Sequence, residues 1–503
     1  MVRSSLAGRA VFALVMMVVF YAFAAAVVAG LVWVGIKVFG MLGQIRGRGL
    51  IALALVGGLC FCAAAVVAWS VLPRWDSFEP PGPEITAAEH PELFVEIRRI
   101  AQQTGQREPR HVYLVPEVNA FVAQRGGILG IGSSRVMGIG LPLMRALQVD
   151  ELRAVLAHEM GHFYGGDTKL GPFIYKTRSG LIRTVVNLTR AQHSVSEAGA
   201  YSLIFTVVQA PFRGFLVAYL RLSQAISRAQ EISADEVAVR AEGKRALIGG
   251  LKKSHAAALA HHLYMNNEVA PLVDAGHLPE VGDGFSRYLK TEAVARLQDS
   301  VVEHELAEGE HDPYDSHPPL RDRITAADAL DVPDREPDTR PAIELVRDPE
   351  AIESADLRKR VDAPLKDIAW ADTHEVWEKK WRGAVEHHKH MLRDVALAEL
   401  DTETRAIYER ARAFLSPPLA DRASDDDLRA WWQSVVGGAF AVILLDEGFL
   451  ATAMPGEPFE FRRGDRTVDP FGEVSKRIRG ETSEEAWTDR LTELGVADRK
   501  LAG

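Results

Sequence analysis

Two long stretches without charge constrain this chain more than any other feature. Ala10–Ile36 and Gly49–Pro73 contain no Asp, Glu, Lys or Arg. A helix rises 1.5 Å per residue, so about 20 apolar residues cross the hydrocarbon core of a bilayer. Each stretch is long enough, whereas the apolar part of a signal peptide has only about 7–15 residues. The sequence predicts two transmembrane helices within residues 1–78, and therefore a multi-pass protein of the cell membrane.

The side of the membrane is not determined by charge. Two spans return the chain to its starting side, so the N-terminus and the residues after Arg74 share a compartment unless further spans follow. Cytoplasmic loops are enriched in Lys and Arg. Three cations lie outside the pair of predicted spans (Arg3, Arg9 and Arg74), and three lie in or beside the loop between the spans (Lys37, Arg46 and Arg48). The two counts are equal, so they favour neither orientation.

Net charge and cysteine content exclude two classes of protein. Lys and Arg number 58 against 68 Asp and Glu, a formal net charge of −10. This balance argues against a nucleic-acid partner, because such binding depends on neutralising phosphates. The two cysteines, Cys60 and Cys62, both lie in the second apolar stretch. They provide no disulfide framework and no cysteine metal site.

After the membrane anchor we expect an α+β domain, mainly helical with a small sheet, over residues 79–330. The sequence Pro80-Pro81-Gly82-Pro83 cannot continue a helix. Apolar residues at helical spacing then predict a helix ending near Gln103, and β-branched residues predict strands over His111–Val115 and Arg135–Ile139.

Two further regions are expected to be helical. Residues 173–220 are apolar but interrupted by arginines, and the uncharged segment Ala198–Phe212 is shorter than a span. We expect long helices on or beside the membrane there, with a third and fourth span as the alternative. A proline-containing acidic stretch at 333–349 is expected to be a surface linker. Residues 331–503 form a helical C-terminal extension of unknown role, with Val435–Leu445, too short to cross a bilayer, in its core.

One helix carries the residues for metal chemistry. In the segment ELRAVLAHEMGH, which starts at Glu151, His158 and His162 stand four residues apart. Both imidazoles then project from one helix face, where they can bind one Zn²⁺. Glu159 lies beside the first histidine and can take a proton from a water bound to the metal. The alternative is a solvated helix face.

A third ligand is predicted farther along the chain. Glu231 and Asp235 lie one turn apart in the helical pattern ISRAQEISADEVAVRA. One carboxylate can bind the metal while the other accepts the free N–H of a ligating histidine. Alone, such a pair is more often a solvated face, so this prediction depends on the preceding HExxH helix.

Taken together, the motifs resemble the HtpX-like and type I CAAX prenyl protease group of integral-membrane zinc metallopeptidases. The matching stretches, in the same order, are NAF from Asn119, DELRAVLAHEMGH from Asp150, Gly166-Asp167, SRAQEISAD from Ser227, and HPPLRDRI from His317. The resemblance covers roughly residues 10–324.

The resemblance implies a role for each matching residue. His158, His162 and Glu231 would bind one zinc ion per chain, Glu159 would be the catalytic base, and Asp235 would support a ligand. His317 would lie near the site, where it would stabilise the oxyanion or cover the open position of the metal. The resemblance also implies a catalytic domain on the cytoplasmic side.

A substrate site is expected next to the active-site helix. The strand Arg135–Ile139, with Val136 and Gly138, would pair with an extended peptide, and Asn119 of the NAF stretch would lie beside it. We therefore predict a membrane-anchored zinc endopeptidase that acts on peptides or proteins, in membrane or misfolded-protein quality control. Three alternatives remain open: an inactive scaffold with a structural zinc site, prenyl-peptide processing, and a small-molecule metallohydrolase. The sequence specifies no oligomeric state.

Overall fold

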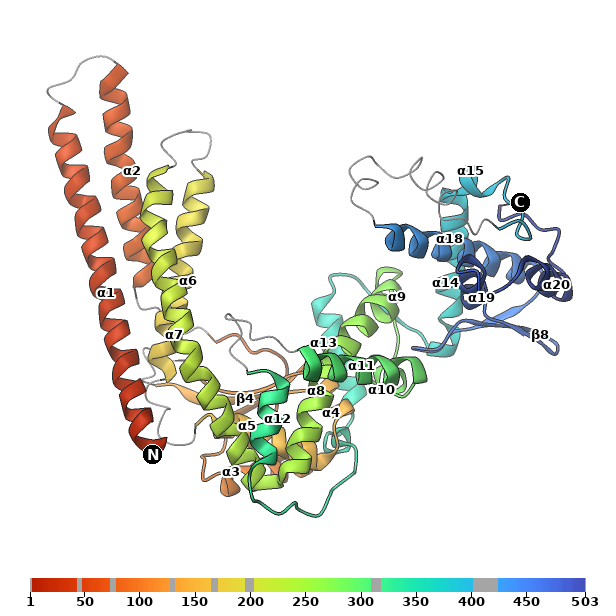
Figure 1. Ribbon diagram of the computed structural model, residues 1–503, viewed down its shortest axis with the longest axis horizontal. Coiled ribbons are helices and arrows are strands. Elements are labelled where there is room, and N and C mark those ends of the chain that lie inside the picture. Colours follow the sequence, from red (N-terminus) through yellow and green to blue (C-terminus); the bar gives the residue numbers. More distant parts are fainter. Residues whose placement is uncertain are drawn as a thin grey trace. The chain divides into compact units, whose positions relative to one another are not determined.

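The computed structural model of the chain divides into two compact units (Figure 1). Unit 1 comprises Met1–Ala256 and Ser300–Arg347, and unit 2 comprises Ala257–Asp299 and Asp348–Gly503. The structure describes residues 2–42, 48–72, 78–126, 132–163, 171–194, 203–308, 318–400 and 424–502. Each unit has its own core and is described by itself.

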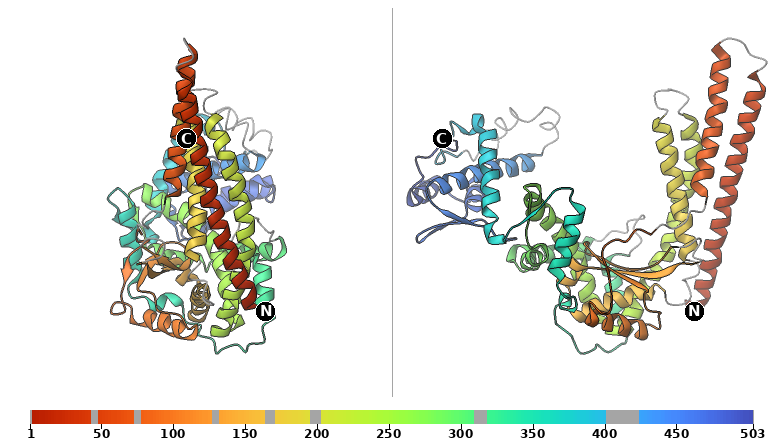
Figure 2. Two further views of the ribbon diagram at one scale, coloured as in Figure 1. Left: turned by 90° about the vertical axis from the view of Figure 1, so that its left-hand side faces the viewer. Right: turned by 180° about the vertical axis from the view of Figure 1, so that it is seen from behind.

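Four long helices form a bundle in unit 1. They are α1 (Val2–Gly40), α2 (Arg48–Val71), α6 (Gly171–Ser194) and the upper half of α7 (Leu203–Glu242) (Figures 1 and 2). Both predicted N-terminal spans are present, because Val15–Gly40 and Gly49–Val71 are long and apolar enough to cross a membrane. The chain end marked N lies at the end of the bundle that adjoins the sheet and the shorter helices.

The structure gives one further candidate span within residues 173–220. Leu203–Arg221 is a third candidate span of 19 residues, because α7 continues through Arg213 and the single charge does not end the apolar segment. The helices α6 and α7 pack along α1 and α2 rather than lying apart from them. This arrangement supports the alternative of a third span in α7; among the described helices α6 is not a candidate span.

The second pair of helices makes polar contacts within the bundle and is apolar on its outer faces. Asn187 of α6 donates a hydrogen bond to Ser70 of α2 at 2.9 Å, and Gln209 of α7 donates to the Val185 carbonyl of α6 at 3.1 Å. Side chains on the outer faces are exposed and apolar (Ile182, Val186, Leu203 and Val207). Polar contacts between helices and an apolar outer surface are typical of helices embedded in lipid.

A four-stranded sheet lies beside this bundle. Its order is β1 (Glu84–Ile85), β2 (His111–Val115), β4 (Ser134–Gly140) and β3 (Ala120–Arg125). The two predicted strands are present as β2 and β4, which run parallel. The strand β3 was not predicted, and it pairs antiparallel with β4 along its whole length.

Helices form the rest of the unit. These are α3 (Pro91–Gln103), α4 (Leu141–Ala146), α5 (Val149–Gly161), α12 (Leu320–Asp328), the short 3₁₀ helix η5 (Ala342–Leu345), and the parts of α8 (Lys244–Tyr264) up to Ala256 and of α11 (Glu292–Glu308) from Ser300. The helix predicted to end near Gln103 is α3, with Leu93, Ile97 and Ile100 fully buried.

The segment expected to be a surface linker is in part bound to α5. The amide of Val149 donates to the Arg340 carbonyl at 2.9 Å, and the amide of Ala342 donates to the Leu147 carbonyl at 2.9 Å. Arg153 of α5 forms ion pairs with Asp338 at 3.1 Å and with Glu96 of α3 at 2.6 Å. The bond to Arg340 satisfies the first amide of α5. Together with the ion pairs, it shows that residues 338–342 belong structurally with the active-site helix.

Unit 2 is mostly helical, but it also contains sheet structure that was not expected. Its core surrounds α18 (Asp425–Asp446), which buries Val436, Ala439, Phe440 and Leu444. By length and composition Asp426–Asp446 of α18 is a fourth candidate span, a longer segment than the apolar run Val435–Leu445 within it. However, 56% of the most apolar stretch of α18 is buried within the protein, against 11% of the corresponding stretch of Val15–Gly40. This burial supports the predicted place of α18 in a C-terminal core.

The other elements of unit 2 surround this helix or form a second cluster around Tyr264 and Trp370. The strands β7 (Leu450–Thr452), β8 (Glu460–Arg463) and β9 (Arg466–Val468) make an antiparallel sheet, and β5 (His277–Leu278) pairs with β6 (Lys366–Asp367). The remaining elements are short helices: η4 (Met265–Val269), α9 (Ala270–Asp274), α10 (Val281–Tyr288), α13 (Pro349–Arg360), η6 (Trp370–Asp372), α14 (His374–His387), α15 (Lys389–Leu392), α19 (Pro470–Ile478) and α20 (Glu484–Leu494).

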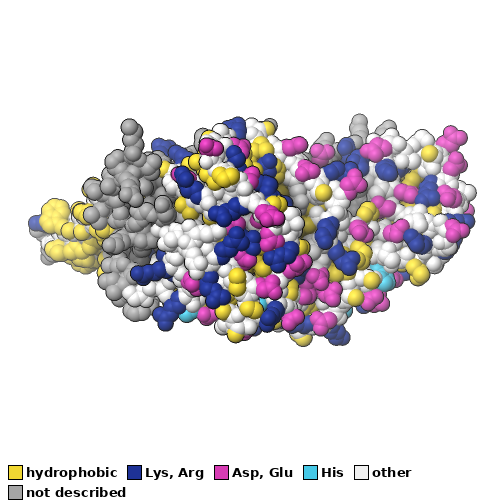
Figure 3. Space-filling model, turned by 90° about the horizontal axis from the view of Figure 1, so that it is seen from below, with side chains coloured by type: hydrophobic (Ala, Val, Ile, Leu, Met, Phe, Trp, Pro, Cys, Tyr) yellow, Lys and Arg dark blue, Asp and Glu magenta, His cyan; other side chains and the backbone are white. Residues whose placement is uncertain are grey.

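The surface in Figure 3 separates apolar and charged regions. Hydrophobic side chains gather at the left-hand end of that view, where the bundle helices extend, whereas acidic and basic side chains are interspersed over the rest of the visible described face. This distribution matches a protein with an apolar anchor and water-exposed remaining parts.

Candidate active site

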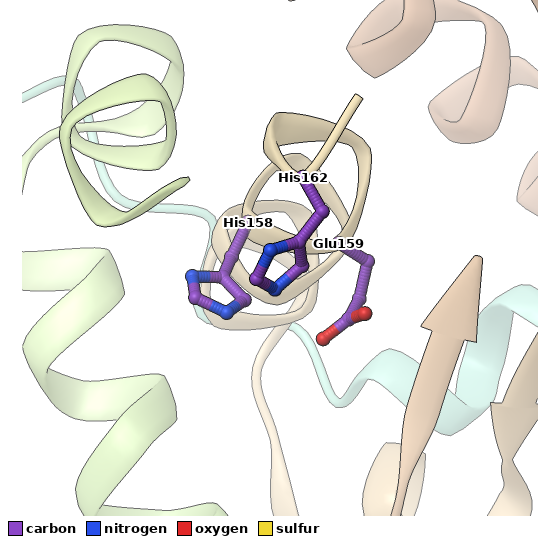
Figure 4. A group of neighbouring side chains, drawn as sticks. All are labelled: His158, Glu159 and His162. Atoms are coloured by element: carbon purple, nitrogen blue, oxygen red, sulfur yellow. The ribbon is translucent and has the colours of Figure 1, made fainter. Parts of the chain in front are cut away.

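The helix α5 positions two histidines on one face. It begins with a capping box, in which Glu151 accepts a hydrogen bond from the Gln148 amide at 2.8 Å, and the buried carboxylates of Asp150 and Glu151 lie in the first turn. At the other end of α5, the rings of His158 and His162 have centroids 4.8 Å apart and stand nearly perpendicular. Figure 4 shows both imidazoles on the same side of the helix.

Glu159 lies beside the two imidazoles. Ligand atoms of His158, Glu159 and His162 all lie within 4.8 Å of one another. Glu159 is half-buried, whereas His158 is buried, and the Glu159 carboxylate lies beside the two imidazoles (Figure 4). A partly accessible carboxylate at this position is suited to exchange protons with a bound molecule.

The helix α7 brings a second carboxylate to the same place. Glu231 is buried, with one carboxylate oxygen 3.4 Å from Nε2 of His158 and the other 3.6 Å from Nε2 of His162. The close approach of α5 and α7 depends on Gly161, because a Cβ there would lie 3.0 Å from Cα of Ala234. The absence of a side chain at Gly161 therefore allows the two helices to meet.

These separations fit a metal ion better than direct hydrogen bonds. Two ligands at about 2.0–2.1 Å from a tetrahedral zinc ion stand about 3.3 Å apart. Glu231 is 3.4–3.6 Å from both imidazoles at once. Glu159 belongs to the compact His-Glu-His cluster, but Glu231 faces Nε2 of both histidines, so we favour His158, His162 and Glu231 as the three metal ligands.

Asp235 and Arg323 hold His158 from behind. Nδ1 of His158 lies 2.8 Å from Oδ1 of Asp235, and both residues are buried. Arg323 of α12, also buried, donates two hydrogen bonds to Asp235, at 2.7 and 2.9 Å. Because Arg323 binds both oxygens of Asp235, the carboxylate has little freedom to rotate.

The surrounding charges shift the pKa values of His158 and Asp235. Burial alone lowers the pKa of His158, but hydrogen bonds with Asp235 and Glu231 outweigh it and raise the pKa to about 9. Burial raises the pKa of Asp235, yet Arg323 and His158 lower it below its ordinary value. In the protein without metal, a proton on His158 thus balances the buried carboxylates.

Arg323 is the residue that the sequence reasoning missed. It lies within the motif HPPLRDRI, but the motif was used only for its histidine and its loop. The sequence signal that could have revealed it is its spacing: Arg323 lies three residues after Leu320 and four before Ala327, both of which α12 buries. A buried arginine requires a carboxylate partner, which Asp235 provides.

The predicted peptide-binding strand requires a correction. The strand β4 is paired on both sides, with β2 and with β3, so Val136 and Gly138 have no free backbone edge for a substrate. Gly138 instead accommodates the ring of Phe121, which a Cβ would approach within 2.3 Å. Among the described strands, β3 is the one next to β4 that lies at the edge of this sheet. Asn119 directly precedes it and accepts a hydrogen bond from the Gly140 amide at 2.8 Å.

Three other histidines, His261, His387 and His388, belong to unit 2. His317 lies outside the described residues. The ring of His261 contacts Phe285, and burial lowers its pKa to about 4. His387 and His388 contact each other in unit 2, with ring centroids 4.7 Å apart. Among the described residues, none of these three histidines belongs to a group of three potential metal ligands.

Known proteins similar to this chain were identified by sequence. Residues 87–331 match the family model described as Peptidase family M48. The protease HtpX homolog of Pyrococcus abyssi is 31% identical over 179 residues, which is 34% of this chain and 58% of the relative. That of Syntrophobacter fumaroxidans is 26% identical over 314 residues, 60% of this chain and 94% of the relative.

A third relative, the protease HtpX of Acinetobacter baylyi, is 26% identical over 244 residues, 46% of this chain and 78% of the relative. The chain spans about 58% of the length of the first curated relatives that it matches. No solved structure matches the chain.

Proposed function

Residues 87–331 belong to peptidase family M48, and from this premise we propose that the protein is a membrane-anchored, zinc-dependent endopeptidase. The observation that carries the proposal is the convergence of His158, His162 and Glu231 on one point, with Glu159 beside it. Two imidazoles and one carboxylate are a donor set of catalytic zinc sites, which leave the fourth position open.

Each residue of the site has its own role in the proposed reaction. When bound, zinc would polarise the scissile carbonyl and favour ionisation of water. Glu159 accepts the proton of the attacking water and then delivers it to the leaving amine, because its carboxylate is the accessible one at the site. Asp235 accepts the Nδ1–H of His158, which leaves Nε2 free to bind the metal. Arg323 fixes Asp235 in this role.

The substrate is an extended peptide or protein segment. Among the described strands, β3 (Ala120–Arg125) lies at the edge of the sheet and contacts α5. A peptide that adds to this edge gains main-chain hydrogen bonds regardless of its sequence, so the side-chain pockets provide the selectivity. This mode of binding suits unfolded or misfolded chains, because a folded substrate has few unpaired backbone groups to offer.

The cellular setting follows from the anchor. The apolar spans would hold the peptidase domain at the bilayer surface, near membrane proteins whose segments are unfolded. We therefore assign the protein to membrane or misfolded-protein quality control, with the catalytic domain at the cytoplasmic face. The relatives named protease HtpX support a proteolytic role.

Replacement of the base tests the mechanism. Glu159→Gln keeps the size of the side chain but removes its ability to accept a proton, so turnover of an unfolded protein substrate should fall about 10²–10⁴-fold. Zinc content, measured by elemental analysis of the same preparation, should stay at the wild-type level. Glu236→Gln, an exposed position on α7, is the matched control. Near-native turnover by Glu159→Gln would exclude Glu159 as the base.

A further inference from the structure

The helix α6 and the first half of α7 are basic in an otherwise acidic protein. Between Gly171 and Ser194, and between Leu203 and Gln230, the sequence contains seven Lys and Arg residues and no Asp or Glu. The whole chain has a formal net charge of −10. Positive charge is thus concentrated on the two helices that pack along α1 and α2, which points to a negatively charged partner at this place.

Three of these arginines are exposed. They are Arg190 on α6, and Arg213 and Arg221 on α7. Among the described residues, none of the three forms an ion pair. Arg190 lies one helical turn after Val186, an exposed apolar residue, so the two side chains share one face of α6. A helix face that combines apolar residues with arginine is suited to the boundary between acyl chains and headgroups.

Two hydrogen bonds fix how far along the bundle the arginines lie. Asn187 of α6 donates to Ser70 of α2 at 2.9 Å, and Gln209 of α7 donates to the Val185 carbonyl of α6 at 3.1 Å. Asn187 and Val185 lie within one turn of each other on α6, so Ser70 and Gln209 are at nearly the same level. Ser70 is next to the last residue of the candidate span in α2. The bonds therefore place Gln209 at the membrane boundary on the side of the peptidase domain.

Arg213 and Arg190 lie on either side of this boundary. Arg213 is one turn after Gln209, about 6 Å closer to the peptidase domain and therefore at the depth of the headgroups. Arg190 is about 5 Å on the other side, a distance that an arginine side chain can extend across to reach the interface. Trp69 lies at the same level and is 64% exposed, as is typical of tryptophan at a membrane–water interface.

A bilayer centred on α7 would bury a charge. By length alone Leu203–Arg221 could lie symmetrically in the membrane, but the exposed Arg213 would then be near the bilayer centre, where arginine is costly. The uncharged span of α2, between Arg48 and Arg74, sets a boundary that avoids this cost. Figure 1 agrees with this boundary, because α1 and α2 extend farther from the sheet than α6 and α7.

We propose that Arg190 and Arg213 bind the headgroup phosphates of anionic phospholipids in the leaflet that faces the peptidase domain. Arginine donates paired hydrogen bonds to phosphate, and anionic lipids, unlike zwitterionic ones, have no cation of their own that opposes it. Arg213 lies on the same continuous helix as Glu231, so bound lipid holds the membrane end of the helix that supplies a proposed metal ligand. Lipid binding of this kind does not require proteolysis and is tested separately from it.

Spin-labelled lipids measure this selectivity directly. In phosphatidylcholine vesicles that contain the full-length protein, electron paramagnetic resonance separates lipid held at the protein surface from free lipid. We expect spin-labelled phosphatidylglycerol to associate about fivefold more strongly than spin-labelled phosphatidylcholine. Replacement of both residues, Arg190→Gln with Arg213→Gln, should lower this ratio to about two or less. Arg98→Gln with Arg462→Gln removes the same charge from exposed positions on α3 and β8 and should leave the ratio unchanged.

Two further measurements separate an electrostatic site from a change in folding. In 1 M NaCl the wild-type ratio should fall toward one, because salt screens exposed charges. Arg190→Lys with Arg213→Lys should keep most of the selectivity, and if the glutamine double variant does not fold, each single glutamine variant should lose part of it. Equal association of both lipids with the wild-type protein would overturn the proposal. Selectivity that persists in the glutamine variants, or that high salt leaves intact, would overturn it as well.

Discussion

At the scale of single residues, the site depends on side chains that do not touch the metal. Asp235 receives two hydrogen bonds from Arg323 and faces Nδ1 of His158, so it fixes both the tautomer and the orientation of a proposed ligand. Arg323 is buried; Asp235 is its nearest carboxylate partner, and Glu231 lies 3.8 Å away. Loss of either Arg323 or Asp235 removes a buried charge partner from the other.

Asp235→Asn tests this arrangement. The amide cannot balance Arg323 and His158, so zinc affinity should fall about 10–100-fold. Competition with a fluorescent chelator would measure the zinc dissociation constant. Glu236→Gln changes the charge of the next residue on the exposed face of α7 and should leave the constant unchanged. Unchanged zinc affinity in Asp235→Asn would assign Asp235 a purely structural role.

The protonation of His158 predicts a pH dependence of metal binding. Its pKa is raised to about 9 in the metal-free protein, so His158 carries a proton at neutral pH that zinc must displace. Zinc affinity should therefore rise about tenfold per pH unit up to about pH 9 and then level off. Titrations in buffers of different ionisation enthalpy would count the protons released. An affinity independent of pH from 7 to 9 would contradict this prediction.

The structure brings together the three residues that the sequence predicted as ligands. His158, His162 and Glu231 lie close to one another, and helical spacing and motif chemistry, which are local properties of the sequence, pointed to them; their role as ligands stays a proposal. Arg323 was missed, because its partner Asp235 is 88 residues away and contact between them depends on how α12 packs on α7. His317 lies outside the described residues, and its role stays a prediction.

At the scale of elements, the contact between α5 and α7 assembles the site. Gly161 lets α7 approach, since its missing Cβ would lie 3.0 Å from Cα and 3.1 Å from the carbonyl oxygen of Ala234. Glu231 lies one turn before Ala234 on the same helix. Any increase in the separation of the helices therefore moves Glu231 away from the histidines.

Gly161→Ala should weaken both the fold and the site. Alanine favours a helix by up to about 1 kcal/mol, but contact with backbone atoms costs about 1–3 kcal/mol. We expect a lower thermal unfolding midpoint and weaker zinc binding. Gly383→Ala in α14, where a Cβ would meet nothing within 4 Å, is the matched control and should not lower the midpoint. Native zinc affinity in Gly161→Ala would show that the helices tolerate the change.

The sheet shows where sequence patterns fail at this scale. The strands β2 and β4 were predicted from β-branched residues, but the strand between them in sequence, β3, was not. Strand order depends on pairing across the sheet, which short-range patterns do not encode. The edge therefore belongs to β3, and the predicted peptide contacts of Val136 and Gly138 are wrong.

At the scale of the whole molecule, apolar length alone does not identify a membrane span. Val15–Gly40 and Asp426–Asp446 both meet the criterion, but the second lies in a core with Trp381 and Phe461. The extension was predicted to be helical, and its three-stranded sheet was missed because its strands have only three or four residues.

The proposed orientation can be tested at Glu79, an exposed residue that follows the anchor. With Cys60 and Cys62 replaced, Glu79→Cys should react with a membrane-impermeant maleimide only after the cells are opened, because the cytoplasmic assignment places it inside. A cysteine in place of Gly40, at the end of α1, should react in intact cells and serves as the control. Labelling of Glu79→Cys in intact cells would reverse the topology.

The central claim is that one zinc ion, held by His158, His162 and Glu231, supports proteolysis by the full-length protein. The most direct measurement is cleavage of an unfolded protein by the purified protein in detergent, before chelation, after chelation and after zinc is returned, with zinc counted at each step. We predict one zinc per chain, loss of cleavage when it is removed, and recovery when it is restored. Cleavage that continues at the same rate in the zinc-free protein would contradict the account.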